Sequence, residues 1–178
     1  MNRIPVLFIL LGVLIGQARI GEWQAYTAPF HINDITGYEQ QAVCGTNGGL
    51  LIYDQDKNIF NTLTVIDQLV GTGVNVVEIG QNGYLWLGGV SPDGFVQVYD
   101  LKTKSSIAEF DFGLTEIIDI SISDSIGFVA FLENQDWGLM EFIYRGENWI
   151  YRDVYRNWPT DFESINAIEI WDDEVMVA

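Results

Sequence analysis

Few residues in this sequence have the type and spacing that catalysis or metal binding requires. His31 is the only histidine and Cys44 is the only cysteine. A zinc site needs several ligands that converge, and a reactive thiol needs a nearby base or cation, which the neighbours of Cys44 do not supply. We therefore expect no metal site and no cofactor, and we expect Cys44 to pack as a small buried hydrophobic residue.

The acidic segment at residues 54–58 begins like a calcium-binding loop but lacks the residues that complete one. Such a loop needs glycine at its sixth position and a bidentate glutamate at its twelfth, and Ile59 and Val65 stand there instead. The sequence also contains no nucleophile elbow, phosphate-binding loop, dinucleotide fingerprint or zinc-protease motif. These observations favour a non-enzymatic protein.

Aromatic residues are better candidates for a binding site. Trp137 and Trp158 lie in turn-rich segments, and Asp161 follows the second of them. A tryptophan exposed beside polar groups is suited to binding sugars or peptides. We predict a ligand-binding rim formed by loops that carry Trp137, Trp158, Asp161 and His31. The alternative for both tryptophans is that they pack the third repeat against its neighbour.

A repeated pattern of apolar residues indicates which strands position these loops. Alternating apolar segments begin at residues 32, 74, 117 and 165, so that successive starts are 42, 43 and 48 residues apart. A turn and a second strand follow each segment, and a third and a fourth strand follow in the first three units. Four short strands in about 40–50 residues are typical of one β-propeller blade, and no segment shows a sustained helical period.

The sequence therefore predicts an all-β protein, a β-propeller with four-stranded antiparallel blades that is incomplete here, with about three full blades plus parts of others. The first strand of each unit is the most apolar, which predicts a place at the central axis with both faces buried. The polar fourth strands are expected at the outer edge. Residues 21–27 resemble the fourth strand at 146–152, which predicts that they belong to a blade whose inner strands come from elsewhere. The repeat units are residues 32–73, 74–116, 117–164 and 165–178, the last of them truncated.

Residues 74–89, VNVVEIGQNGYLWLGG, resemble the repeat of the two-component-regulator propellers. Residues 44–54, CGTNGGLLIYD, are similar to the N-terminal propellers of type IX secretion-associated surface proteins. The third unit departs from the pattern, with FVAF at 128–131 where Leu-Trp-Ile-Gly would stand. The resemblance implies a periplasmic sensor domain or a surface or secretion-linked module, and its motifs describe the packing of blades rather than a ligand.

Residues 1–18 have the pattern of a secretory signal peptide. Arg3 precedes an apolar stretch, and Gly16 and Ala18 place small residues where a signal peptidase cleaves. The stretch is shorter than the roughly 20 residues that span a bilayer, although an uncleaved anchor is the alternative. We assign residues 1–18 to the signal peptide, residues 19–178 to the N-terminal part of a propeller domain, and the protein to the periplasm, the medium or the cell surface.

The charge balance argues against nucleic-acid binding. Asp and Glu number 25 against 8 Lys and Arg, which gives a formal net charge of −17. Such a surface repels phosphate backbones and anionic lipid headgroups, so that membrane contact would require parts not present in this chain. The expected partner is an unidentified protein, peptide or glycan.

The sequence thus favours a non-enzymatic extracytoplasmic binding or sensing propeller. One alternative is a structural module of a secretion-associated or cell-surface protein. Another is a propeller hydrolase or lyase whose catalytic residues lie in a missing part, because the fold alone does not decide between them.

Overall fold

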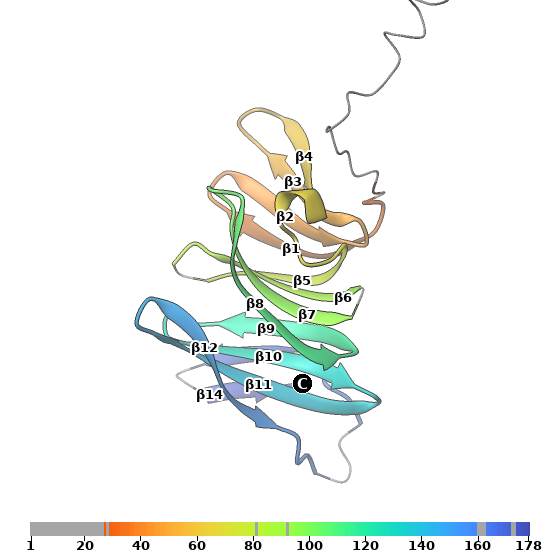
Figure 1. Cartoon of the computed structure of the whole chain (residues 1–178), viewed down its shortest axis with the longest axis vertical. Helices are drawn as coiled ribbons and strands as arrows, with labels where there is room; N and C mark the ends of the chain where they lie inside the picture. The colour runs from red at the N-terminus through yellow and green to blue at the C-terminus, as the bar shows by residue number, and fades with distance from the viewer. Residues whose placement is uncertain (1–26, 28, 81, 92, 160–162, 172–173) are drawn as a thin grey trace, which may run out of the picture.

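The chain forms antiparallel sheets that stack one behind another, as the computed structural model shows (Figure 1). The structure describes residues 27 and 29–178, except 81, 92, 160–162 and 172–173. The predicted signal peptide, Asp161 and nearly all of the strand-like segment at 21–27 lie outside the described residues, so the predictions for them stay predictions.

Three of the sheets have four strands in sequential order, and the fourth sheet has two described strands. The first sheet comprises β1 (Ile32–Tyr38), β2 (Gln41–Thr46), β3 (Gly49–Asp54) and β4 (Ile59–Leu63). The second comprises β5 (Gly73–Ile79), β6 (Leu85–Ser91), β7 (Gly94–Asp100) and β8 (Ser105–Leu114). The third comprises β9 (Glu116–Ile122), β10 (Ile126–Glu133), β11 (Asp136–Arg145) and β12 (Asn148–Tyr155), and the fourth comprises β13 (Ile168–Trp171) and β14 (Glu174–Val177). The predicted repeat is confirmed as a repeat of sheets.

Aspartates begin the hairpins that join the third and fourth strands of the first two sheets. Asp54 Oδ1 accepts a hydrogen bond from the backbone N–H of Lys57 at 3.0 Å, and Asp100 Oδ1 accepts one from that of Lys102 at 2.8 Å. An aspartate that bonds the backbone a few residues ahead stabilises a tight turn. One 3₁₀ turn, Val65–Asp67, which the sequence did not predict, links the first sheet to the second.

The first strands lie side by side along the stack. β1 contacts β5, β5 contacts β9, and β9 contacts β13. Asp34 Oδ2 accepts from the backbone N–H of Val77 at 2.9 Å, and Asp119 Oδ2 accepts from that of Ile168 at 2.7 Å. The same kind of bond therefore ties the first sheet to the second and the third to the fourth. The predicted central position of these strands is confirmed.

Close packing between sheets depends on a small residue in the second strand. Gly88 lies on β6, where a Cβ atom would come within 2.4 Å of Cγ2 of Ile117 and 3.2 Å of Cδ1 of Ile120 on β9. A non-bonded contact of 2.4 Å does not occur between real carbon atoms, so any side chain at residue 88 would force Ile117 on the third sheet to shift.

The same arrangement recurs at the other two junctions. A Cβ on Gly45 would lie 3.0 Å from Cγ1 of Val74 and 3.2 Å from Cγ1 of Val77 on the next sheet. Ala130 is fully buried in one cluster with Ile165 and Ile168. The small residues at these junctions occupy the same place in their sheets, because each pairs with an equivalent residue of its own first strand. We call this place, held by Gly45, Gly88 and Ala130, the small-residue position.

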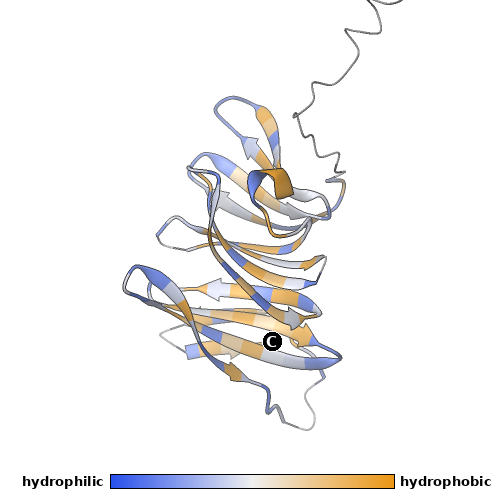
Figure 2. Cartoon of the chain, in the orientation of Figure 1, coloured by the Kyte–Doolittle hydropathy of each residue, from blue (hydrophilic) through white to orange (hydrophobic). Residues whose placement is uncertain are grey.

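The prediction that first strands are buried on both faces holds for β5, where the neighbouring residues Val76 and Val77 are buried in two different core clusters, but it is wrong for β1. The second and third strands of the second sheet are more completely buried than β5, where Glu78 and Ile79 are only half-buried. Ile35 on β1 is 60% exposed. A first strand has sheets on its two faces but the open axis along one edge, and β1 has no described sheet on one side. The outer fourth strands are exposed as predicted, and Figure 2 shows hydrophilic residues at the hairpin between β11 and β12.

Candidate ligand-binding site

Trp137 and Trp158 lie together at the junction of the third and fourth sheets. The indole Nε1 of Trp158 donates a hydrogen bond to the backbone oxygen of Trp137 at 2.9 Å. Trp137 stands near the start of β11 and Trp158 follows β12, so the sheet itself brings both segments to one end. Both side chains are half-buried and pack on a core cluster that includes Phe128 and Leu139.

Two cavities adjoin the Trp158 side chain. We call the first, of about 500 Å³, the apolar cavity; it is lined by Phe128, Leu139, Tyr155, Trp158, Glu174, Val175 and Val177. The second, of about 410 Å³, is polar and is lined by Gln135, Asp136, Trp137, Arg156, Trp158 and Glu163. Both volumes lie in the range of sites that hold small ligands or side chains. Trp158 therefore packs on the core and also forms a wall of each cavity.

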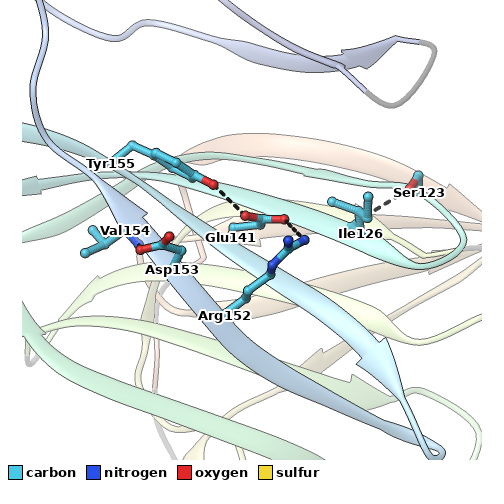
Figure 3. Close-up of polar contacts among 7 residues, drawn as sticks. All are labelled: Ser123, Ile126, Glu141, Arg152, Asp153, Val154 and Tyr155. Carbon is cyan, nitrogen blue, oxygen red and sulfur yellow. Dashed lines mark hydrogen bonds and ion pairs between the residues drawn. The ribbon is translucent and has the colours of Figure 1, made fainter.

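A polar network holds Tyr155 at the apolar cavity. Figure 3 shows Tyr155 and Arg152 of β12 reaching the carboxylate of Glu141 on β11. The Tyr155 hydroxyl donates to Glu141 Oε2 at 2.6 Å, and Arg152 Nη1 donates to Oε1 at 2.8 Å. The bond to this carboxylate is the main reason why the pKa of Tyr155 is raised. Glu141 is only 5% exposed, and a carboxylate so buried is costly unless it is paired in this way.

Sequence reasoning did not find this network, although one signal was present. Glu141 interrupts the apolar strand β11 at the position that Ile52 and Val98 occupy in the first two sheets. A charged residue at a repeatedly apolar position indicates a partner brought by the fold.

His31 does not join the two tryptophans. It lies in an exposed segment directly before β1, in the first sheet, and lines neither cavity. Asp161 lies outside the described residues. The structure thus brings together two of the predicted rim residues, adds Tyr155 to them, and places His31 elsewhere.

A third hollow, of about 530 Å³, lies at the beginning of the first strands and includes Asn33, Asn75 and Glu116 in its lining. Asn33 Nδ2 donates to the backbone oxygen of Val74 at 2.9 Å, and Asn75 Nδ2 donates to Glu116 Oε1 at 2.6 Å. These amides bridge neighbouring sheets, which is a structural role.

Carboxylates of successive first strands approach one another on the axis. Burial raises the pKa of Glu78 to about 7, with further contributions from the charges of Asp34, Glu169 and Asp119. Burial also raises the pKa of Asp119. Perturbed carboxyl groups can mark a functional site, but Asp34 and Asp119 already accept backbone N–H groups of the next sheet. Their position follows from the stacking of the sheets.

Among the described residues, no group of three or more His, Cys, Asp or Glu side chains has a geometry that could hold a metal ion. Asp54, which opened the calcium-like segment, forms an ion pair with Lys57 Nζ at 2.6 Å. Cys44 is buried in β2 as predicted, and burial raises the pKa of its thiol. No helix in the described part of the chain is long and apolar enough to cross a bilayer.

Comparison with known proteins identifies the architecture. No protein-family model and no curated protein matches the sequence. Solved structures match the fold, among them the N-terminal domain of Nup159, at 16% identity and a TM-score of 0.55 over 80% of this chain and 37% of that one. The WD40 repeats of RRP9 match at 8% identity and a TM-score of 0.57, over 83% of this chain and 43% of that one. The fold is that of an open β-propeller.

The designed Ika4 protein matches at 12% identity and a TM-score of 0.58, over 88% of this chain and 92% of the design. The chain spans about two fifths of the Nup159 domain and of the RRP9 repeats. At these identities the likeness establishes the fold alone, and it agrees with sheets that do not close into a ring. The predicted fold class is confirmed.

We predict that Glu78→Gln stabilises the protein at high pH but not at low pH. The folded state raises the pKa of Glu78 to about 7 from 4.5, so the folded chain holds this proton more tightly than the unfolded chain. Its contribution to stability is therefore lost as the pH rises from about 4.5 to 7. Allowing for screening at a half-buried site, the variant should gain on the order of 1–2 kcal/mol at pH 8 and nothing at pH 4, as measured by urea unfolding.

Glu109→Gln is the matched control, because it removes the same charge from an exposed residue of the outer strand β8. It should change the free energy of unfolding by less than about 0.5 kcal/mol at either pH. A gain for Glu78→Gln that is equal at pH 4 and pH 8 would contradict the assignment.

Proposed function

We propose that this protein is a non-enzymatic extracytoplasmic module that binds a protein, peptide or glycan at the junction of its third and fourth sheets. The observation that carries the proposal is the Trp158 side chain, which is anchored to Trp137 and forms a wall of two cavities. Aromatic faces beside polar groups provide contact area for sugars and peptides at a low entropic cost.

The chemistry around the apolar cavity supports binding rather than catalysis. The buried carboxylate behind it, Glu141, accepts hydrogen bonds from Arg152 and Tyr155, which gives it a structural role in holding Tyr155 at the cavity. Most of the remaining lining is aliphatic or aromatic. Ligand sites of this composition hold a molecule by contact area and a few polar groups.

A structural role in a secretion-associated or cell-surface protein is the second candidate, and one observation favours it. The outer face of β1 exposes Ile32 and Ile35, which correspond to residues that pack against the preceding sheet at each later junction. An apolar face of this kind is suited to assembly with a further sheet.

The extracytoplasmic location is tested by export of a reporter. We expect residues 1–31, fused to an alkaline phosphatase that is active only outside the cytoplasm, to give an active periplasmic enzyme. Leu11→Arg should abolish most of that activity, because a charge interrupts the apolar stretch that the export machinery recognises. Equal activity from the two fusions would contradict the assignment of residues 1–18.

The binding site is tested by Trp158→Ala. Wild-type protein is screened on arrays of peptides and glycans, and each compound that binds is titrated by calorimetry. Trp158→Ala should weaken binding at least tenfold, because the loss of one aromatic contact surface costs on the order of 1–2 kcal/mol or more. Trp171→Ala is the control, since Trp171 is 66% exposed on β13 and lines neither cavity. Equal loss from both variants would sink the site assignment.

A further inference from the structure

Four aromatic side chains pack together at the junction of the second and third sheets. Phe110 and Phe112 of β8 stack with their ring centroids 6.3 Å apart. The ring of Phe112 lies 5.1 Å from that of Tyr151 on β12, and the ring of Phe110 lies 4.9 Å from that of Phe142 on β11. The rings of Tyr151 and Phe142 are 6.0 Å apart. Each ring therefore contacts two of the others.

This cluster extends from the core to the surface. Phe142 is fully buried and packs on Trp86 of β6, with ring centroids 5.4 Å apart. Phe112 is 38% exposed and Tyr151 is 37% exposed. We call these two residues the outer aromatic pair. Adjoining exposed aromatic side chains with polar surroundings mark contact sites more often than isolated ones do, and the buried members of the cluster hold this pair in place.

The first junction closes the equivalent place with a polar contact. In the third sheet Tyr151 pairs with Phe142. The registers of the second and third strands make Ser106 and Tyr99 the corresponding pair in the second sheet. The Oγ of Ser106 accepts a hydrogen bond from Gln97 Nε2 at 3.0 Å. A small polar side chain therefore suffices at this place, and the packing of two sheets does not require an exposed ring there.

Carboxylates flank the outer aromatic pair. Glu109 and Asp111 are exposed on β8, and Asp153 is exposed on β12. None of the three forms an ion pair with another described residue. The cation that β12 carries, Arg152, is bonded to Glu141, and β8 carries none. The two strands thus combine exposed aromatic faces with an excess of negative charge, which complements a cationic partner.

The edge of β8 favours an extended peptide as the source of that cation. β8 is the outermost strand of the second sheet, and no described strand pairs with its outer edge. Figure 1 shows β8 running from its hairpin with β7 toward the third sheet, where it contacts β10. Backbone groups on an outer edge can bond an extended segment of another protein.

We propose that the outer aromatic pair and the carboxylates beside it bind an arginine-containing segment of a partner protein. A guanidinium group is planar and weakly hydrated, so it stacks on an aromatic face and also pairs with a carboxylate. A lysine ammonium supplies the same charge without the planar face. Tyr151 packs toward the second sheet and Trp158 toward the fourth, so this surface is separate from the Trp158 site and the inference does not rest on the proposed function.

The test uses two fluorescein-labelled peptides, GRGRGRGRG and GKGKGKGKG, which have the same charge and spacing. Fluorescence anisotropy at physiological ionic strength measures the affinity of each peptide for the full chain. We expect saturable binding of the arginine peptide, at least threefold tighter than binding of the lysine peptide, because arginine adds stacking on the aromatic faces. The ratio separates stacking from general attraction to an acidic protein.

Phe112→Ala should remove this preference, so that the two peptides bind with affinities within twofold of each other. Phe60→Ala is the matched control and should keep the preference, because Phe60 is 67% exposed on the outer strand β4 and its ring contacts Tyr53. Phe112→Leu retains a large apolar side chain without a ring and should also lose the preference, which keeps the test valid if the alanine variant does not fold. Circular dichroism checks the fold of each variant.

Asp111→Asn tests the contribution of charge. It should weaken binding of both peptides at least twofold, because the amide no longer attracts a cation, and it should leave the preference for arginine intact. Asp56→Asn is the matched control: it removes the same charge from an exposed residue of the hairpin between β3 and β4. Both affinities should then stay close to those of the wild type.

Equal binding of the two peptides by the wild type, or an equal change from Phe112→Ala and Phe60→Ala, overturns the inference. So does an equal effect of Asp111→Asn and Asp56→Asn. Loss of the preference in Trp158→Ala but not in Phe112→Ala would place the peptide at the other junction and would also overturn it. A dimer of the chain that Phe112→Ala dissociates and the arginine peptide does not would assign the surface to a second copy instead.

Discussion

The structure depends on how closely one sheet can approach the next. A four-stranded sheet has two apolar faces and cannot cover either of them with its own residues, so each sheet must pack against its neighbours. The approach is set by one position in each second strand, where Gly45, Gly88 or Ala130 leaves room for branched side chains of the following first strand. Dispersion contacts fall away steeply with distance, so the loss of this room would weaken the whole junction.

The features of the axis follow from that approach. Asp34 and Asp119 can bond backbone N–H groups of the neighbouring first strand because the strands lie so close. Burial within the stack raises the pKa of Glu78, and the nearby charges of Asp34, Glu169 and Asp119 raise it further. In a chain of net charge −17, the sheets stack although this places like charges together, which indicates that apolar packing outweighs the repulsion.

The candidate site lies at the junction of the third and fourth sheets. The apolar cavity there is lined by Phe128, Leu139 and Tyr155 of the third sheet and by Val175 and Val177 of β14. Tyr155 is held at that space by a buried carboxylate that two donors satisfy. The site therefore combines an apolar hollow with fixed aromatic walls, which suits the binding of a ligand by contact area.

The sequence predicted the fold well because each repeat is defined by local patterns of apolar and turn residues. Alternating apolar residues and turn residues recur at nearly constant spacing, and the predicted units begin within three residues of the observed first strands β1, β5, β9 and β13. The meeting of Trp137 and Trp158 was also predictable, since both were expected at one end of the third unit, although Trp137 lies on β11 rather than in a loop. The Glu141 network and the cavity were not, because they depend on side chains that approach only after three strands have paired. The exposure of β1 was not predicted either, since its alternating pattern resembles those of β5 and β9, which lie between two sheets.

The close approach of the sheets is tested most directly by NMR. Methyl-labelled protein should show strong nuclear Overhauser effects from the Gly88 Hα protons to the Cγ2 methyl of Ile117, and from the Gly45 Hα protons to a methyl of Val74. A Cβ at residue 88 would lie 2.4 Å from that isoleucine methyl, so the glycine protons must face it. Absence of both cross-peaks in a folded sample, with these methyl groups in contact with water, would contradict the stacked-sheet account.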